Sequence, residues 1–275
     1  MKDKTLCSGL FALSLALLYA GTAGAVACGG GPPPGVGTGP RKAVTPGDTQ
    51  PLPEEEPYET VEQRQEQIRR KEDWVKRRPD DLAAQKELGI HYHHLAYKHR
   101  VKGAAHKAFK QLSKLREQSP ADAELDAWTG SARTLVARDS INPIKKLRWA
   151  KKGFRLIDAA VKRSSNSVVI RNIRANNSLH VPRFLKRESL AKGDLLHMET
   201  LFGRSDAKWW SSEKHDENDK KNVMAEAFFK LAGIFQKENN ALQAASYLKK
   251  AAGILSSSPW SILAKRRLAE APPKK

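Results

Sequence analysis

From Tyr58 onward, the chain is a succession of segments rich in Ala, Leu, Lys, Arg and Glu, separated by breaks that contain Pro. These residue types favour helices, and the period-two alternation that is typical of half-buried strands is rare. Because Pro disrupts a helix interior, each break marks a helix boundary. The pattern predicts an all-α domain over 58–271, with helices at 58–77, 81–99, 103–118, 122–139, 143–163, 167–179, 183–202, 222–238, 240–256 and 259–270.

Capping residues support these boundaries. Asp81 follows Pro79, and Asn142 comes directly before Pro143. A short Asp or Asn side chain accepts a hydrogen bond from the free N–H groups of the first helical turn, and Pro fits the first helical position. We therefore expect new helices to begin after Asp81 and Asn142.

Residues 1–27 have the three-part layout of a secretory signal. Lys2 and Lys4 precede an uncharged apolar run at 6–20, and small residues fill 21–27. An apolar run of this length is shorter than the roughly 20 residues of a membrane-spanning helix. The layout predicts an exported protein with a removable signal peptide, and an uncleaved anchor helix is the alternative.

The residues around Cys28 resemble the lipobox of bacterial lipoproteins, in which the cysteine becomes the lipidated first residue. The sequence at 25–28 is AVAC, with Ala25 where the motif favours Leu. An ordinary signal peptidase could also cut here, since small residues stand at the A-x-A positions. Removal of the signal takes Cys7 away and leaves Cys28 as the only thiol, which lipidation would explain. The resemblance implies a lipid anchor on Cys28 in a bacterial membrane, facing the periplasm, with the outer membrane favoured over the inner.

Residues 28–57 are dominated by Gly and Pro and hold almost no large apolar side chains. Such a segment buries too little surface to offset the entropy of ordering it, so we predict a disordered tether with a reach of roughly 30 Å. We also predict a short disordered tail over 272–275.

The net charge of the chain is +19. A strongly basic domain favours anionic partners, including phospholipid headgroups, envelope glycans and acidic proteins. Export makes nucleic acid an unexpected partner.

A repeated pattern of large and small residues occurs near the C-terminus. Its positions are Phe228, Leu231, Ala232, Phe235, Ala244, Leu248, Ala251 and Ser256. This pattern resembles the tetratricopeptide repeat (TPR), a helix–turn–helix unit of 34 residues, with Ser256 in place of the closing proline. Small residues such as Ala232 and Ala251 would let two antiparallel helices approach closely.

Three earlier segments match the repeat more loosely. Leu88, Gly89 and Tyr92 fit its first helix, and Ala108, Leu112 and Leu115 fit its second, with seven additional residues between the halves. Further units are expected near 128–165 and 167–202. The resemblance covers roughly 80–258 and implies a right-handed helical solenoid with a groove that binds peptides or proteins. An irregular helical bundle with similar spacing is the alternative.

Two groups of residues are candidates for partner contacts in such a groove. Arg171, Arg174 and Asn177 share helical spacing, and an Arg side chain suits carboxylate or phosphate. Trp209 and Trp210 lie in a polar stretch, and adjacent tryptophans cannot both face one helical core. A solvated basic face and ordinary packing are the respective alternatives.

A third group is basic. Lys145, Lys146, Arg148, Lys151, Lys152 and Arg155 lie on one predicted helix. For a tethered protein, an anionic membrane surface is a natural counterpart to this helix, whereas solubility alone is the alternative.

His91 and His94 share a helix face with Glu87, a spacing that raises the question of a metal site. A metal site would need convergent ligands from another helix, so we predict surface or groove histidines and no metal or other cofactor. The chain also lacks a Gly-rich phosphate loop and a G-x-S-x-G elbow. We therefore expect a non-catalytic scaffold or assembly factor that holds envelope proteins or peptides, with binding of an anionic envelope glycan or lipid as the alternative.

Overall fold

A computed structural model describes residues 59–210 and 216–270, except for the side chain of Arg183. The predicted signal peptide, the lipidation site Cys28, the tether and the C-terminal tail lie outside the described residues. Within the described ranges the fold is all-α, as predicted, and the secondary structure contains no strand beyond one isolated bridge between Ser167 and Lys208.

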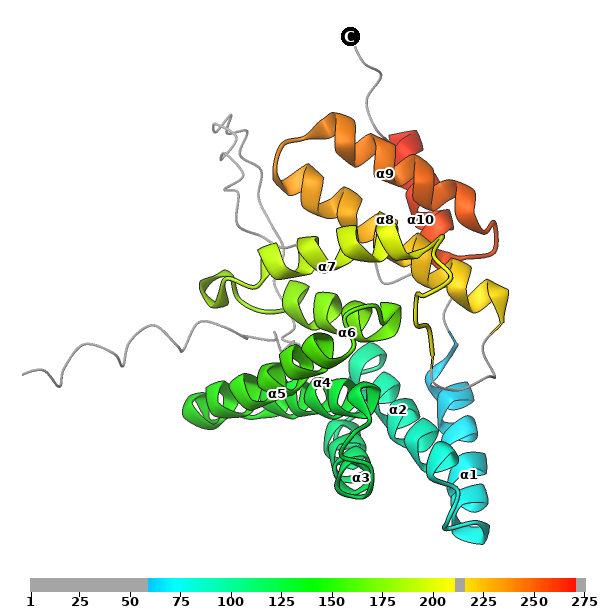
Figure 1. The fold of residues 1–275 in the computed structure, drawn as a ribbon, viewed down its shortest axis with the longest axis vertical. Helices are drawn as coiled ribbons and strands as arrows, with labels where there is room; N and C mark the ends of the chain where they lie inside the picture. Colours follow the sequence, from blue (N-terminus) through cyan, green and yellow to red (C-terminus); the bar gives the residue numbers. More distant parts are fainter. Residues whose placement is uncertain (1–58, 211–215, 271–275) are drawn as a thin grey trace, which may run out of the picture. The chain divides into compact units, whose positions relative to one another are not determined.

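The described part of the chain forms α-helices, most of which are connected by short turns, with longer connections before and after α7 (Figure 1). The helices are α1 (Val61–Arg77), α2 (Leu82–Lys98), α3 (Ala104–Gln118), α4 (Ala123–Asp139), α5 (Pro143–Arg163), α6 (Val168–Leu179), α7 (Glu188–Leu201), α8 (Glu217–Lys237), α9 (Ala241–Ile254) and α10 (Pro259–Glu270). None of the described helices combines the length and apolar character needed to cross a bilayer.

The predicted caps are confirmed. The Asp81 side chain accepts a hydrogen bond from the backbone N–H of Ala84 at 2.8 Å. Asn142 accepts one from the N–H of Lys145 at 3.0 Å, with Pro143 at the first helical position of α5. Each cap satisfies a backbone donor that the helix itself leaves without an acceptor.

The prediction of one helix over 183–202 is wrong. A short 3-10 helix, η1 (Arg183–Leu185), comes first, and α7 begins only at Glu188. Lys186 lies between them with φ of +50°. A left-handed residue cannot continue a right-handed α-helix, so the chain starts a new helix after it.

Helix α8 begins earlier than the predicted residue 222. Asp216 and Asp219 form a reciprocal capping box, in which the side chain of each accepts a hydrogen bond from the backbone N–H of the other. This cap allows the polar residues that follow Asp216 to form the first turns of the helix.

Consecutive helices pair as hairpins. Extensive contacts join α2 to α3, α4 to α5, α6 to α7 and α8 to α9. Helix α4 also contacts α2 and α6, and α8 contacts α10. The first helices of three successive hairpins, α2, α4 and α6, are therefore neighbours, which matters for the site described below.

Three apolar clusters form the core. One lies between α1, α2, α3 and α4, and the second lies between α4, α5 and α6. The third contains residues of α6, α7, α8, α9 and α10. Because α4 and α6 each contribute to two clusters, these two helices connect the parts of the domain.

Most residues that carry the repeat pattern lie in this core, whereas Ser256 is exposed. Phe228, Leu231, Ala232 and Ala251 are buried, and the side chain of Phe235 is partly buried against them. In the earlier hairpin, Gly89 of α2 lies so close to α3 that an added Cβ would be 2.6 Å from Leu112 Cδ2. The absence of a side chain at Gly89 allows this close approach of α2 and α3.

Candidate functional site

Buried polar side chains connect the helices α2, α4 and α6. His93 Nε2 lies 2.7 Å from Ser131 Oγ, and Asn177 donates to the same oxygen from Nδ2 at 2.9 Å. Thr134 donates to Asn177 Oδ1 at 2.5 Å. The three residues His93, Ser131 and Asn177 come from three different helices, so this chain of hydrogen bonds fixes the relative position of those helices.

A second set of polar contacts reaches from α2 to α8. Tyr97 Oη lies 3.4 Å from His180 Nε2, and His180 Nδ1 lies 2.7 Å from the backbone oxygen of Asn176. Lys230 of α8 donates to Asn176 Oδ1 and forms an ion pair with Glu226. Side chains from α2, α6 and α8 therefore meet at one place.

Aromatic rings lie beside these polar groups. Trp128 of α4 makes an edge contact with His94 of α2, with ring centroids 5.7 Å apart. The rings of Tyr97 and His180 also meet edge to face, at 5.6 Å. Tyr97, His94 and Trp128 are partly buried, and His180 is exposed. Partly covered aromatic rings beside polar groups are typical of protein-binding surfaces.

We call this surface the cross-helix face. It comprises His94, Tyr97, Trp128, Asn172, Asn176, His180, Glu226 and Lys230. Its members come from α2, α4, α6 and α8 and from the turn after α6.

The charges on the cross-helix face follow from its surroundings. Desolvation by the neighbouring helices lowers the pKa of His180 and holds the pKa of His94 well below its usual value, so both rings are neutral at pH 7. Burial alone would raise the pKa of Glu226, but Lys230, Asn172 and Lys98 lower it below its usual value. Glu226 is therefore ionised, and Lys230 is its cationic partner.

Two buried polar atoms of the cross-helix face have no hydrogen-bond partner within the described protein. They are His94 Nδ1 and Asn172 Oδ1, and both are shielded by the surrounding side chains. A buried polar atom without a partner costs free energy, which a ligand group could recover after a small side-chain rotation.

The structure brings Arg171 and Arg174 together on an internal carboxylate. Arg171 Nη1 donates to Asp194 Oδ1 at 2.8 Å, and Arg174 donates to both Asp194 oxygens at 2.6 and 2.7 Å. The Asp194 side chain is fully buried. These two arginines therefore face α7, away from the contacts that α6 makes with α8. A partner that bound these two arginines in place of Asp194 would leave the buried Asp194 carboxylate without its cations.

Asn177, the third predicted groove residue on α6, lies elsewhere. Its side-chain amide hydrogen-bonds to Ser131, Thr134 and the backbone oxygen of Ile173. On the same helix Asn172 and Asn176, which the sequence did not single out, face α8 and hydrogen-bond to Glu226. Their spacing of four residues placed them on one helix side, but nothing in the sequence showed which side meets α8.

Trp209 and Trp210 are both partly buried, and they pack into different clusters. Trp209 stacks on Phe202 in the cluster of α6 to α10, with ring centroids 5.9 Å apart. Trp210 packs against the cluster of α4 to α6. The two rings are 5.6 Å apart, and they connect the segment after α7 to two parts of the core.

His91 lies outside the cross-helix face. Its Nδ1 is 2.7 Å from Arg64 Nη1, and burial together with Arg64 lowers the pKa of His91 to about 4. Glu87, which shares its helix face, forms an ion pair with Lys71 at 2.6 Å. The described residues contain no group of three or more side chains arranged to hold a metal ion.

A cavity of about 230 Å³ lies between α1, α2 and α3. Ile68, Tyr92 and Leu95 line its apolar part, and Arg69, Glu72 and Lys107 lie at its rim. The volume is below the roughly 300 Å³ at which ligand pockets begin. The cross-helix face is therefore the stronger candidate site.

No family model matches the chain, and a search of curated proteins finds no match to its sequence.

Proposed function

We propose that this protein is an exported, non-catalytic scaffold of the bacterial envelope, anchored by a lipid on Cys28, that binds an extended segment of a partner protein. In this proposal the hairpins α2–α3, α4–α5, α6–α7 and α8–α9 stack as a TPR-like right-handed solenoid. The contacts of α4 with both α2 and α6 support this arrangement, because stacked hairpins bring their first helices into contact.

The cross-helix face is the proposed binding surface. The observation that carries the proposal is a set of contacts between helices that are far apart in the sequence. Tyr97 contacts His180 beside Asn176, to which Lys230 donates, and Trp128 contacts His94. Amide and ammonium groups can bind the backbone carbonyls of an extended segment, and the aromatic rings can cover its apolar side chains. Such a surface suits a peptide better than a small metabolite.

Photo-crosslinking tests the binding surface. A photoreactive amino acid at Tyr97 or His180, in the full chain expressed in its native cells, should yield one dominant adduct of constant mass. The same residue at Ser246, which is exposed on α9, serves as the control and should not yield that adduct. Equal adducts at all three positions would contradict the proposal.

Substitution of one amide completes this test. Asn176→Ala removes an amide of the cross-helix face and leaves the Lys230–Glu226 ion pair in place, so adduct formation should fall severalfold. The matched control is Asn218→Ala, which changes an exposed Asn in the first turn of α8 and should have no effect.

The anchor is tested separately. The intact mass of the mature protein from native membranes should correspond to a chain that begins at an acylated Cys28. A chain beginning at Val26, without a lipid, would refute the anchor and leave the binding surface unaffected.

A further inference from the structure

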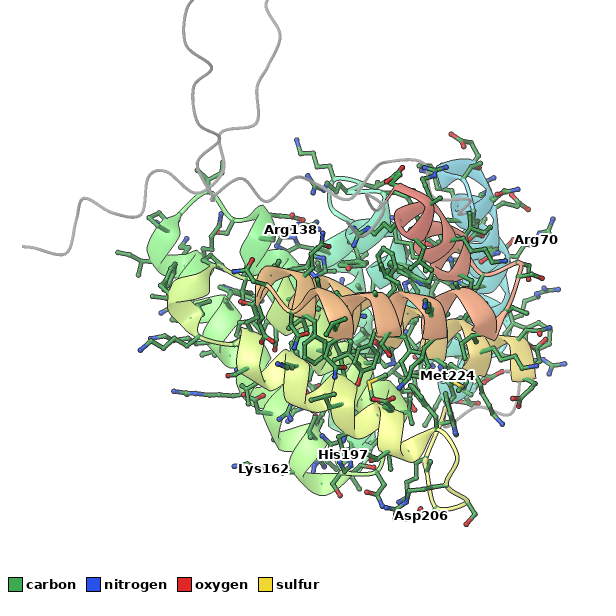
Figure 2. All side chains as sticks on the ribbon, turned by 90° about the horizontal axis from the view of Figure 1, so that it is seen from above. Arg70, Arg138, Lys162, His197, Asp206 and Met224 are labelled. Carbon is green, nitrogen blue, oxygen red and sulfur yellow. The ribbon has the colours of Figure 1, made fainter. Side chains whose placement is uncertain are left out.

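The outward side of α5 carries a basic stripe, which comprises Arg148, Lys151, Arg155 and Lys162. These residues follow Ile144 at intervals of three, four and seven residues, which places all five on one side of the helix. All five are exposed. Figure 2 shows the Lys162 side chain extending from the end of the α4–α5 hairpin opposite to Arg138.

The stripe is not neutralised by acidic neighbours. Residues 141–157 contain six Lys or Arg residues and no Asp or Glu. Asp158, which lies between Arg155 and Lys162, forms an ion pair with Arg187 at 2.7 Å. Among the described residues, no acidic side chain pairs with Arg148, Lys151 or Arg155, whereas Arg163 at the end of α5 forms an ion pair with Asp126. The positive charge of the stripe is therefore available to an external anion.

Two isoleucines project beside the basic stripe, at the α4–α5 turn. Ile141 is 99 % exposed and Ile144 is 77 % exposed, the two highest values among the large apolar side chains described as exposed. The intervening residues, Asn142 and Pro143, are exposed as well. Apolar side chains that stay exposed in the folded protein do not stabilise the fold. Their position at this turn therefore indicates a contact with another surface.

A third exposed apolar side chain belongs to the connection between α6 and α7. Phe184, in η1 between α6 and α7, is 57 % exposed, and Lys186, which follows η1, is exposed as well. Figure 1 shows the α4–α5 and α6–α7 turns projecting toward the same side, at the left of the view. A flat partner could reach both turns.

We propose that the α4–α5 turn and the outward side of α5 dock on an anionic phospholipid bilayer, with Ile141 and Ile144 inserted among the lipids and the basic stripe against the headgroups. Lys and Arg are attracted to anionic lipid surfaces, and apolar side chains next to them can enter the boundary of the acyl region. The buried side of α5 packs on α4 and α6, so the turn and the stripe lie on the side of α5 that is open to lipid.

A bilayer fits these features better than a folded protein partner does. The isoleucines stand on a projecting turn and would need a matching pocket in a protein, whereas a fluid bilayer accepts them without one. A soluble polyanion would bind the basic stripe but would leave the isoleucines exposed to water. The surface shares no residue with the cross-helix face, so this inference does not depend on the proposed scaffold function.

Fluorescence from position 144 provides the first test. The full chain carries Cys7→Ser, Cys28→Ser and Ile144→Cys, with a polarity-sensitive fluorophore on the introduced thiol, and is mixed with vesicles of phosphatidylcholine and phosphatidylglycerol. We expect a blue shift and quenching by brominated acyl chains, and neither effect on vesicles of phosphatidylcholine alone. The same label at Ser246→Cys is the control for association through the N-terminal residues, because it should stay unquenched.

Vesicle binding by variants provides the second test. Ile141→Ser with Ile144→Ser should weaken binding at least tenfold, since both side chains would lose their burial in lipid. Changing Arg148, Lys151 and Arg155 to Gln should weaken it about fivefold for each charge removed. All these residues are exposed, so the circular dichroism spectrum and the unfolding midpoint should not change.

Two results would overturn the proposal. One is binding to anionic vesicles without quenching at position 144. The other is an unchanged affinity of the isoleucine variant, together with equally tight binding to a soluble polyanion such as heparin, which would identify the stripe as a site for a soluble anionic polymer.

Discussion

Gly130 of α4 and Gly153 of α5 face each other so closely that a Cβ atom on either residue would lie 2.7 Å from the backbone oxygen of the other. Backbone atoms cannot move away as a flexible side chain can. This contact sets the separation of the two helices, and α5 in turn carries the basic stripe.

Gly130→Ala should therefore lower the free energy of unfolding by about 2–3 kcal/mol, because the added methyl group forces α4 and α5 apart. Chemical denaturation measures the change. Gly233→Ala is the matched control, since a Cβ there meets no atom within 4 Å and Ala favours the interior of α8. That variant should gain about 0.5–1 kcal/mol. Equal effects of the two substitutions would show that the glycine contact is not tight.

Asp194→Asn should lower the free energy of unfolding by about 3 kcal/mol. The substitution keeps the shape of the side chain but leaves the partly buried Arg171 without its anion and Arg174 with Asp158 alone, at 3.7 Å. Replacing Asp194 by Leu and both arginines by Met in one variant should recover most of the loss, because no uncompensated charge remains. A small effect of Asp194→Asn would mean that the arginines are available to a partner, as the sequence suggested.

Stability should fall as the pH drops below about 6.5, because of the buried histidines. Burial lowers the pKa of His93 to about 3, and burial and Arg64 lower that of His91 to about 4, from the usual histidine value of 6.5. Between pH 6.5 and the folded-state pKa of each histidine, the unfolded chain binds a proton that the folded chain does not. Each histidine therefore reduces stability by about 1.4 kcal/mol for every pH unit by which the pH falls in that range. Above pH 6.5 neither contributes to the pH dependence.

Urea unfolding at pH 7, 6 and 5 measures this slope. His93→Gln keeps a hydrogen-bonding side chain beside Ser131 and removes the titrating ring, so its stability should depend less on pH than that of the unsubstituted chain. An identical slope in the variant would show that His93 takes up a proton in the folded state.

Trp209→Ala and Trp210→Ala should each lower the free energy of unfolding by about 2 kcal/mol, since each partly buried ring packs into a different apolar cluster. Because the two rings lie 5.6 Å apart, the double variant should deviate from the sum of the single variants. Leu242→Ala, at a side chain that is 71 % exposed, is the control and should have little effect. Unchanged stability with lost partner binding would instead support the predicted groove role of the tryptophans.

The candidate site was less predictable than the fold. The sequence predicts Arg171 and Arg174 as groove residues because exposed arginines suit anionic ligands. In the structure they bind Asp194, which is 20 or more residues away in the sequence. Tyr97 and His180 form a contact across 83 positions that no local pattern encodes. Helical spacing shows which residues share a side of one helix, but not which helix lies against that side.

The sequence by itself determined the helices and most of their limits, since caps such as Asp81 and Asn142 and breaks at proline act through neighbouring residues. It also determined the excess of positive charge and the small residues that allow close helix packing. Only the tertiary structure decided that Lys186 interrupts a predicted helix, that Asp194 takes the arginines, and that Ile141 and Ile144 project into solvent. The physical reason is that burial and ion pairing depend on which distant helices meet, and that is a property of the whole packed chain.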